Sequence, residues 1–86
     1  MKRTLKDKFE GLSGRIVRSW KRNNGDRVLL SIQRYKGKTG ADLRIWRRRK
    51  DEFRASMSGL RINPSELPSL FASIKRLKRL ADDDEI

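Results

Sequence analysis

The chain has 86 residues, with 23 Lys and Arg against 11 Asp and Glu, a formal net charge of +12, and neither cysteine nor histidine. This composition excludes disulfides, the usual zinc ligand sets, and catalysis by a thiol or an imidazole. The surplus of positive charge predicts a polyanionic partner, with nucleic acid favoured over an anionic membrane surface.

Three parts of the chain differ in composition. Residues 1–13 form a basic N-terminal arm or a short helix, residues 14–81 a single domain, and residues 82–86 an acidic tail that we expect to be disordered. A domain this small has a marginal core without disulfides or metal, so a second subunit is the remaining source of burial.

The N-terminal part contains a short apolar stripe. Leu5, Phe9 and Leu12 recur at helical spacing behind Thr4, a residue type that caps helices. A helix of this length is unstable alone, so we expect it only where the stripe docks on another element. The alternative is a frayed basic arm.

Strand-like runs follow, separated by turn signals. Asn23, Asn24 and Gly25 form a hairpin signal after the first run, and KGKT at residues 36–39 connects the second run to the third. The charged segment RRRKDE, at residues 47–52, is expected to be a turn. The four runs cover residues 15–22, 26–35, 41–46 and 53–62. They predict a four-stranded antiparallel meander.

Alternation within these runs assigns two faces to the predicted sheet. Tyr35, Arg44 and Trp46 share the polar face. The face that we expect to be turned inward carries the apolar residues Val28, Leu30, Ile32, Leu43, Ile45, Leu60 and Ile62.

A helix is predicted after the last strand. Asn63, Pro64 and Glu66 combine a capping side chain, a proline at the first helical position and a glutamate at the third. Pro68 removes a backbone hydrogen bond, so the first turn is expected to be irregular or the regular helix to begin near it. The sequence thus predicts an α+β fold.

The apolar stripe of this helix predicts a dimer. From Pro64 to Ala81 the helix would extend about 27 Å, more than one small sheet can cover. Because a marginal core also needs added burial, we predict a homodimer. Its interface is expected to contain Leu70, Phe71, Ile74 and Leu77.

Aromatic residues alternate with cations along the strands. Trp20, Tyr35 and Trp46 lie among Lys and Arg residues, and unpaired bases stack on such rings while cations contact the phosphates. This combination favours single-stranded over duplex nucleic acid. The alternative for Trp20 and Trp46 is a place in the core or in a subunit contact.

The string RYKGKTGADLRIW, followed by GLRINPSEL, resembles the single-stranded-DNA-binding domain of the Positive Cofactor Four transcriptional coactivators. The matching positions are an aromatic residue followed by KGK at Tyr35 to Lys38, a D-L-R segment at Asp42 to Arg44, and the stretch from Gly59 to Glu66. The similarity covers about residues 26 to 75, and the chain looks like a compact bacterial or viral member of that family.

The resemblance implies a curved antiparallel four-stranded sheet with a C-terminal helix, paired as a homodimer through the helices, with single strands along the sheets. The turn is more basic here than in the family, which implies phosphate contacts at Arg47 and Arg48. The nucleic-acid-binding residues expected from the pattern and the resemblance together are Tyr35, Lys36, Lys38, Arg44, Trp46, Arg54, Arg47, Arg48 and Trp20.

The function expected from these features is single-stranded DNA binding with little sequence specificity, in support of transcription, replication or repair. RNA binding or a chaperone role uses the same contacts, and a transcription regulator that binds other transcription or replication proteins is a further alternative. No metal or other cofactor is expected, and no enzyme activity, because the acids and serines lack catalytic partners. Without a secretory signal or an apolar stretch of membrane-spanning length, the chain is expected inside the cell, in the cytoplasm or nucleoid, or in the nucleus of a eukaryote.

Overall fold

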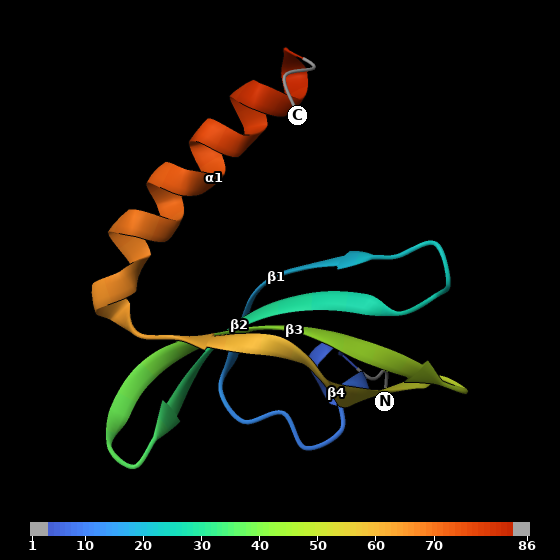
Figure 1. Ribbon diagram of the computed structural model, residues 1–86. Helices are drawn as coiled ribbons and strands as arrows, with labels where there is room; N and C mark the ends of the chain where they lie inside the picture. Colours follow the sequence, from blue (N-terminus) through green and yellow to red (C-terminus); the bar gives the residue numbers. More distant parts are fainter. Residues whose placement is uncertain (1–3, 84–86) are drawn as a thin grey trace.

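A computed structural model describes residues 4–83, except for the side chain of Tyr35. Four antiparallel strands form one sheet in the order β1-β2-β3-β4, and a helix follows (Figure 1). The strands are β1 (Arg15–Lys21), β2 (Arg27–Tyr35), β3 (Lys38–Arg49) and β4 (Glu52–Ile62). The predicted α+β meander with a C-terminal helix is therefore confirmed. None of the described helices is long and apolar enough to cross a membrane.

Two turns are shorter than predicted. β2 and β3 are joined by Lys36 and Gly37 alone, both with positive φ, which is the backbone requirement of a two-residue type I′ hairpin turn. β3 continues to Arg49, so the turn predicted at residues 47–52 is wrong and shrinks to Lys50 and Asp51. Charged side chains are compatible with pairing here because this end of the strand is exposed to water on both faces.

Strand pairing defines two faces of the sheet. Leu29 pairs with Arg44, Ser31 with Asp42, and Arg27 with Trp46, so these residues share what we call the covered face. On the opposite side, which we call the open face, the paired residues are Val28 with Ile45, Leu30 with Leu43, Leu60 with Leu43, and Trp20 with Val28.

The N-terminal segment gives the covered face its core. It forms a single 3-10 turn, η1 (Lys6–Lys8), in which Thr4 and Asp7 each accept a hydrogen bond from the other's backbone N–H. Phe9 follows and is buried against Leu29 and Trp46. The stripe predicted from residue 5 onward therefore does dock on another element, but as one short turn, and residues 4–13 belong to the domain.

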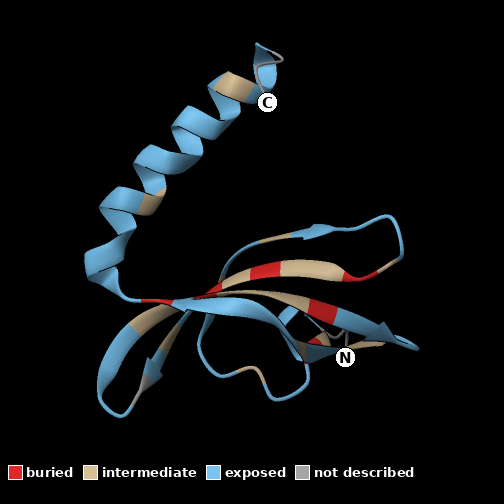
Figure 2. Ribbon diagram, in the orientation of Figure 1, coloured by how far each residue is buried: buried red, intermediate tan, exposed pale blue. Residues whose placement is uncertain are grey.

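The open face is not covered within one chain. Ile32 and Leu60 are 42% and 61% exposed, so the expectation that this face is turned inward is wrong for the single chain (Figure 2). Only Ile62, at the sheet end near the helix, is buried.

The helix extends away from the sheet (Figure 1). A capping box between Asn63 and Glu66 starts it, with a 3-10 turn η2 (Pro64–Glu66) before the regular helix α1 (Leu67–Asp82). The irregular first turn predicted from Pro68 is confirmed. No residue of α1 is buried.

The acidic end is partly helical. Asp82 is the last residue of α1, and its carboxylate lies 2.7 Å from the Lys78 ammonium, so the prediction that Asp82 is disordered is wrong. An i,i+4 pair at a helix end explains this, although Lys precedes Asp here, the less favourable order. Residues 84–86 of the predicted tail lie outside the described residues.

Candidate nucleic-acid interface

The predicted binding residues are divided among three places in the sheet. Lys36 and Lys38 lie at the β2–β3 turn, Arg47, Arg48 and Arg54 lie at the β3–β4 hairpin, and Arg44 and Trp46 lie between them. β3 has 12 residues, so its ends are ~36 Å apart at the usual rise of a strand. The sheet therefore presents two basic ends, separated by a centre whose side chains have other partners.

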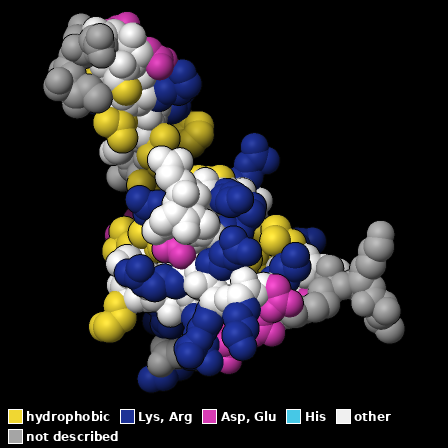
Figure 3. Space-filling view, turned by 90° about the vertical axis from the view of Figure 1, so that its right-hand side faces the viewer, with side chains coloured by type: hydrophobic (Ala, Val, Ile, Leu, Met, Phe, Trp, Pro, Cys, Tyr) yellow, Lys and Arg dark blue, Asp and Glu magenta, His cyan; other side chains and the backbone are white. Residues whose placement is uncertain are grey.

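The β3–β4 hairpin end is strongly basic. We call residues 47–54 the basic hairpin; its five cations are Arg47, Arg48, Arg49, Lys50 and Arg54. Arg47 and Arg54 are directly opposite each other across the two strands, which brings two positive charges together on one face. Lys and Arg side chains gather over this end of the sheet in Figure 3. The two guanidinium groups repel each other unless an anion lies between or beside them.

A buried carboxylate holds the basic hairpin against the neighbouring β1–β2 turn. The Asp26 side chain accepts hydrogen bonds from the backbone N–H of Arg48 (2.9 Å) and from the Asn24 amide (3.0 Å). Its other contact is distant, 3.8 Å from the Arg47 guanidinium, which remains 65% exposed. Asp26 therefore positions the start of the hairpin and leaves the Arg47 charge available to solvent.

Sequence reasoning missed Asp26. The N-N-G-D string of the turn is the only signal for it, because the Asn24 side chain also accepts a bond from the Asp26 N–H, as turn-forming Asn residues do. Its tie to Arg48, 22 residues away, depends on tertiary structure.

Arg54 has a local acidic partner. Its Nε donates to the Glu10 carboxylate at 2.9 Å, and both side chains are about half exposed. The Glu10 N–H in turn donates to the Phe53 carbonyl, which fixes the N-terminal segment along the edge of β4. An exposed pair of this kind contributes about 0.2 to 1 kcal/mol, so a stronger anion can replace Glu10.

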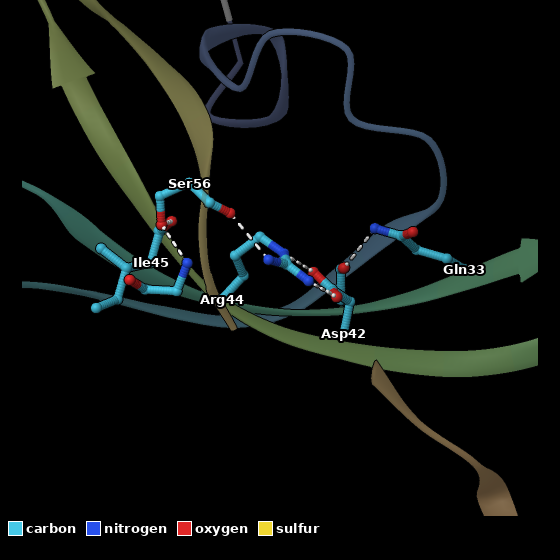
Figure 4. A network of polar contacts seen from close by, with 7 residues as sticks. Gln33, Asp42, Arg44, Ile45 and Ser56 are labelled. Carbon is cyan, nitrogen blue, oxygen red and sulfur yellow. Dashed lines mark hydrogen bonds and ion pairs between the residues drawn. The ribbon is translucent and has the colours of Figure 1, made fainter. Parts of the chain in front are cut away.

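Arg44 is engaged within the protein. Its Nε and Nη2 donate to the two Asp42 carboxylate oxygens at 3.1 and 3.0 Å, and Nη1 donates to the Ser56 carbonyl at 2.9 Å (Figure 4). The Arg44 side chain is largely buried in this network. The guanidinium thus neutralises Asp42 and braces β4, and its nitrogens that bond Asp42 and Ser56 are not available to a phosphate.

Gly59 makes room for that network. It stands opposite Arg44 on β4, and a Cβ there would come within 2.8 Å of the Arg44 Cβ and 2.7 Å of its Cγ. The glycine therefore allows the Arg44 side chain to lie flat across β4 toward Ser56.

Trp46 is a core residue. Its side chain is 4% exposed, with the Phe9 ring packed edge-on at 5.3 Å, and Phe9 also stacks on Phe53 at 5.0 Å. The expectation of an exposed stacking ring at Trp46 is wrong, because the N-terminal segment lies over it. The alternative place for this tryptophan, in the core, is the observed one.

The remaining predicted residues are exposed or outside the description. Lys36 and Lys38 are exposed at the β2–β3 turn, and the Tyr35 side chain lies outside the described residues. Trp20 is half exposed on the open face, where it pairs with Val28. The structure therefore keeps the two basic ends as candidate contacts and removes Trp46 from them.

Among the described residues, no group of three or more Asp or Glu is arranged to hold a metal ion. Comparisons with protein families, with curated proteins and with solved structures give no match. The resemblance to Positive Cofactor Four therefore stays a hypothesis that rests on the motifs in the sequence.

Proposed function

We propose that this protein binds single-stranded nucleic acid with little sequence specificity, as a homodimer, in support of transcription, replication or repair. The observation that carries the proposal is the basic hairpin, where Arg47 and Arg54 are paired across two strands and remain more than half exposed. Phosphate, like carboxylate, accepts paired hydrogen bonds from guanidinium groups, and a nucleic acid presents phosphates in a row.

The shape of the sheet favours a single strand over a duplex. The two basic ends lie ~36 Å apart along a sheet that twists along its length (Figure 1). Duplex DNA is stiff over about 150 base pairs, whereas a single strand can follow a twisted surface and contact both ends. Contacts to phosphates alone explain low sequence specificity.

A second copy of the chain is the proposed cover for the open face and the helix. Phe71, Ile74 and Leu77 are all more than half exposed, and Leu70 is partly exposed on the same helix. With Leu60 and Ile32 on the open face, they leave more large apolar side chains in water than is usual for a monomer of this size. A homodimer paired through Leu70, Phe71, Ile74 and Leu77 would carry two basic hairpins, one from each copy of the chain.

The same apolar surface also favours a second candidate function, an adaptor that binds a transcription or replication protein. The two functions differ in their need for nucleic acid. If the arginines of the basic hairpin were replaced by uncharged residues, an adaptor would still bind its protein partner, whereas a single-strand-binding protein would lose its affinity for nucleic acid. We propose no catalytic role in either case, because Asp42, the buried acid of the covered face, is paired with Arg44.

The test is the anisotropy of labelled oligonucleotides of equal length, single-stranded DNA, duplex DNA and RNA, at two or more salt concentrations. Contacts to about five phosphates give a slope of log affinity against log salt of roughly −3.5 on single strands. Arg47→Gln should flatten that slope by about 0.7, since it removes one phosphate contact. Arg76→Gln, on the exposed helix α1, is the control for loss of one positive charge. Equal or tighter binding to duplex DNA would contradict the proposal.

A further inference from the structure

β4 contains a bulge of three residues next to the basic hairpin. Arg44 pairs with Gly59 and Trp46 pairs with Ala55, so Ser56, Met57 and Ser58 together stand opposite Ile45 alone. A bulge interrupts the ladder and redirects the side chains it carries. Here it turns Met57 outward, and this side chain is 98% exposed.

Ser56 holds this bulge in one conformation. Its hydroxyl donates to the Ile45 carbonyl at 2.7 Å and accepts a bond from the Ser58 N–H at 3.1 Å. Its carbonyl accepts the bond from Arg44 Nη1, which ties the bulge to the buried ion pair with Asp42 (Figure 4). The exposed position of Met57 is thus fixed by bonds on both sides of it.

Met57 shares a surface hollow with several cations. A shallow hollow on this side of the β3–β4 ladder is lined by the bulge and by the arginines of the basic hairpin: Arg47, Arg48, Arg49, Arg54, Ala55, Ser56, Met57 and Ser58. An apolar side chain held in water beside several guanidinium groups suits a ligand that combines anionic and apolar parts.

We propose that Met57 contacts a nucleobase of a single strand whose phosphates lie on Arg47 and Arg54. The inference rests on the proposed function and adds to it the bulge as the base-contacting element. An inorganic phosphate or an acidic peptide side chain would use the arginines and leave Met57 in water. A base has a flat apolar surface, and methionine sulfur makes favourable contacts with aromatic rings. Methionine is also a side chain that proteins insert against base steps.

Low specificity follows from the residue type. The unbranched methionine side chain adapts to surfaces of different shape and offers no strong hydrogen bond for reading a base. Met57 therefore adds affinity for unpaired bases of any identity.

Oxidation by dilute peroxide gives the first test, because the chain has two methionines, Met1 and Met57. The probe is an oligothymidylate, and sulfoxide formation at each methionine is followed by peptide mass spectrometry. We expect the oligonucleotide to slow oxidation of Met57 several-fold and to leave Met1 unchanged. Protection of Met57 without oligonucleotide, increasing with protein concentration, would overturn the proposal by placing the residue in a subunit contact.

Substitution gives the second test. Met57→Ala should weaken binding of the oligothymidylate about two- to ten-fold, in line with the strength of sulfur–ring contacts, without changing the salt slope. Met57→Leu should retain most of the affinity. The matched control is Val17→Ala, since Val17 is an exposed apolar residue at the bulge of β1, distant from the basic hairpin.

The outcomes separate this inference from the proposed function. Tight single-strand binding with full affinity in Met57→Ala and unchanged oxidation would overturn the base contact and leave the proposed function standing. Failure of the parent protein to bind any oligonucleotide would overturn both. Protection of Met57 by vesicles of anionic phospholipid, without protection by the oligonucleotide, would also overturn the base contact.

Discussion

On one face of the sheet Trp46 is 4% exposed, whereas on the other Leu60 is 61% exposed, although both belong to the same pair of strands. The covered face carries the polar residues Ser31, Asp42 and Arg44, yet it holds the core, because Phe9 and the N-terminal segment lie over it. The open face is the more apolar one and has no such cover within the chain. The described chain thus covers its mixed face and leaves its apolar face exposed to solvent.

The largest loss of stability is expected from replacing Phe9, the residue that covers Trp46. Phe9→Ala removes a buried ring in contact with two others, so it should lower the free energy of unfolding by about 3 to 5 kcal/mol. Urea unfolding monitored by tryptophan fluorescence measures this change in the free energy of unfolding. The control is Leu5→Ala, in the same segment but 42% exposed, which should cost much less. Equal stability of the two variants would mean that the N-terminal segment does not close the covered face.

A smaller effect is expected at Gly59, under the ion pair of the covered face. Gly59→Ala should destabilise the fold by about 1 to 3 kcal/mol, because the alanine Cβ would collide with Cβ and Cγ of the Arg44 side chain. Gly40→Ala is the matched control in a strand, since its Cβ would meet only the Ile62 carbonyl at 3.4 Å. Thermal unfolding by circular dichroism compares the two variants. A stabilised Gly59→Ala protein would contradict the packing of Arg44 across β4.

The exposed apolar residues of α1 and of the open face should give the smallest change in free energy and the clearest change in oligomeric state. We expect the parent chain to be a dimer, and Leu77→Asp to raise its dissociation constant about tenfold, or 1.4 kcal/mol. Leu60→Lys should act in the same direction if the sheet also enters the contact. Sedimentation equilibrium measures both, with Val17→Lys as a control on the edge strand. A stable monomer of the parent chain would contradict the proposed dimer.

Much of the fold could be predicted from local sequence signals. The Asn-Gly turn, the strand-like runs and the Asn63 to Glu66 helix start each depend on neighbours in the chain, and each is present in the structure. The extent of β3 was not predicted. Three consecutive arginines, Arg47 to Arg49, cannot continue a buried strand, but the end of β3 is exposed, so the strand continues through them.

The candidate site was less predictable. Lys36, Lys38, Arg47 and Arg48 were predicted from the pattern of charges and from the resemblance, and all four are exposed. Arg44 and Trp46 have the residue types of a binding site, and alternation places them correctly on one face. Whether that face meets solvent depends on a segment more than 30 residues earlier in the chain, which no local pattern reports.

The order of elements, the alternation of the two faces, the positive charge and the apolar helix stripe therefore follow from the sequence, because each is a property of residues close together in the chain. The cover of Phe9 over Trp46, the pairing of Arg44 with Asp42 and the outward position of Met57 beside the arginines depend on tertiary contacts. These depend on strand register and on the fold-back of residues 4–13, where distant groups meet. At Gly14, a side chain would collide with the Ile32 carbonyl, so even the path of that fold-back is fixed by a contact across the sheet.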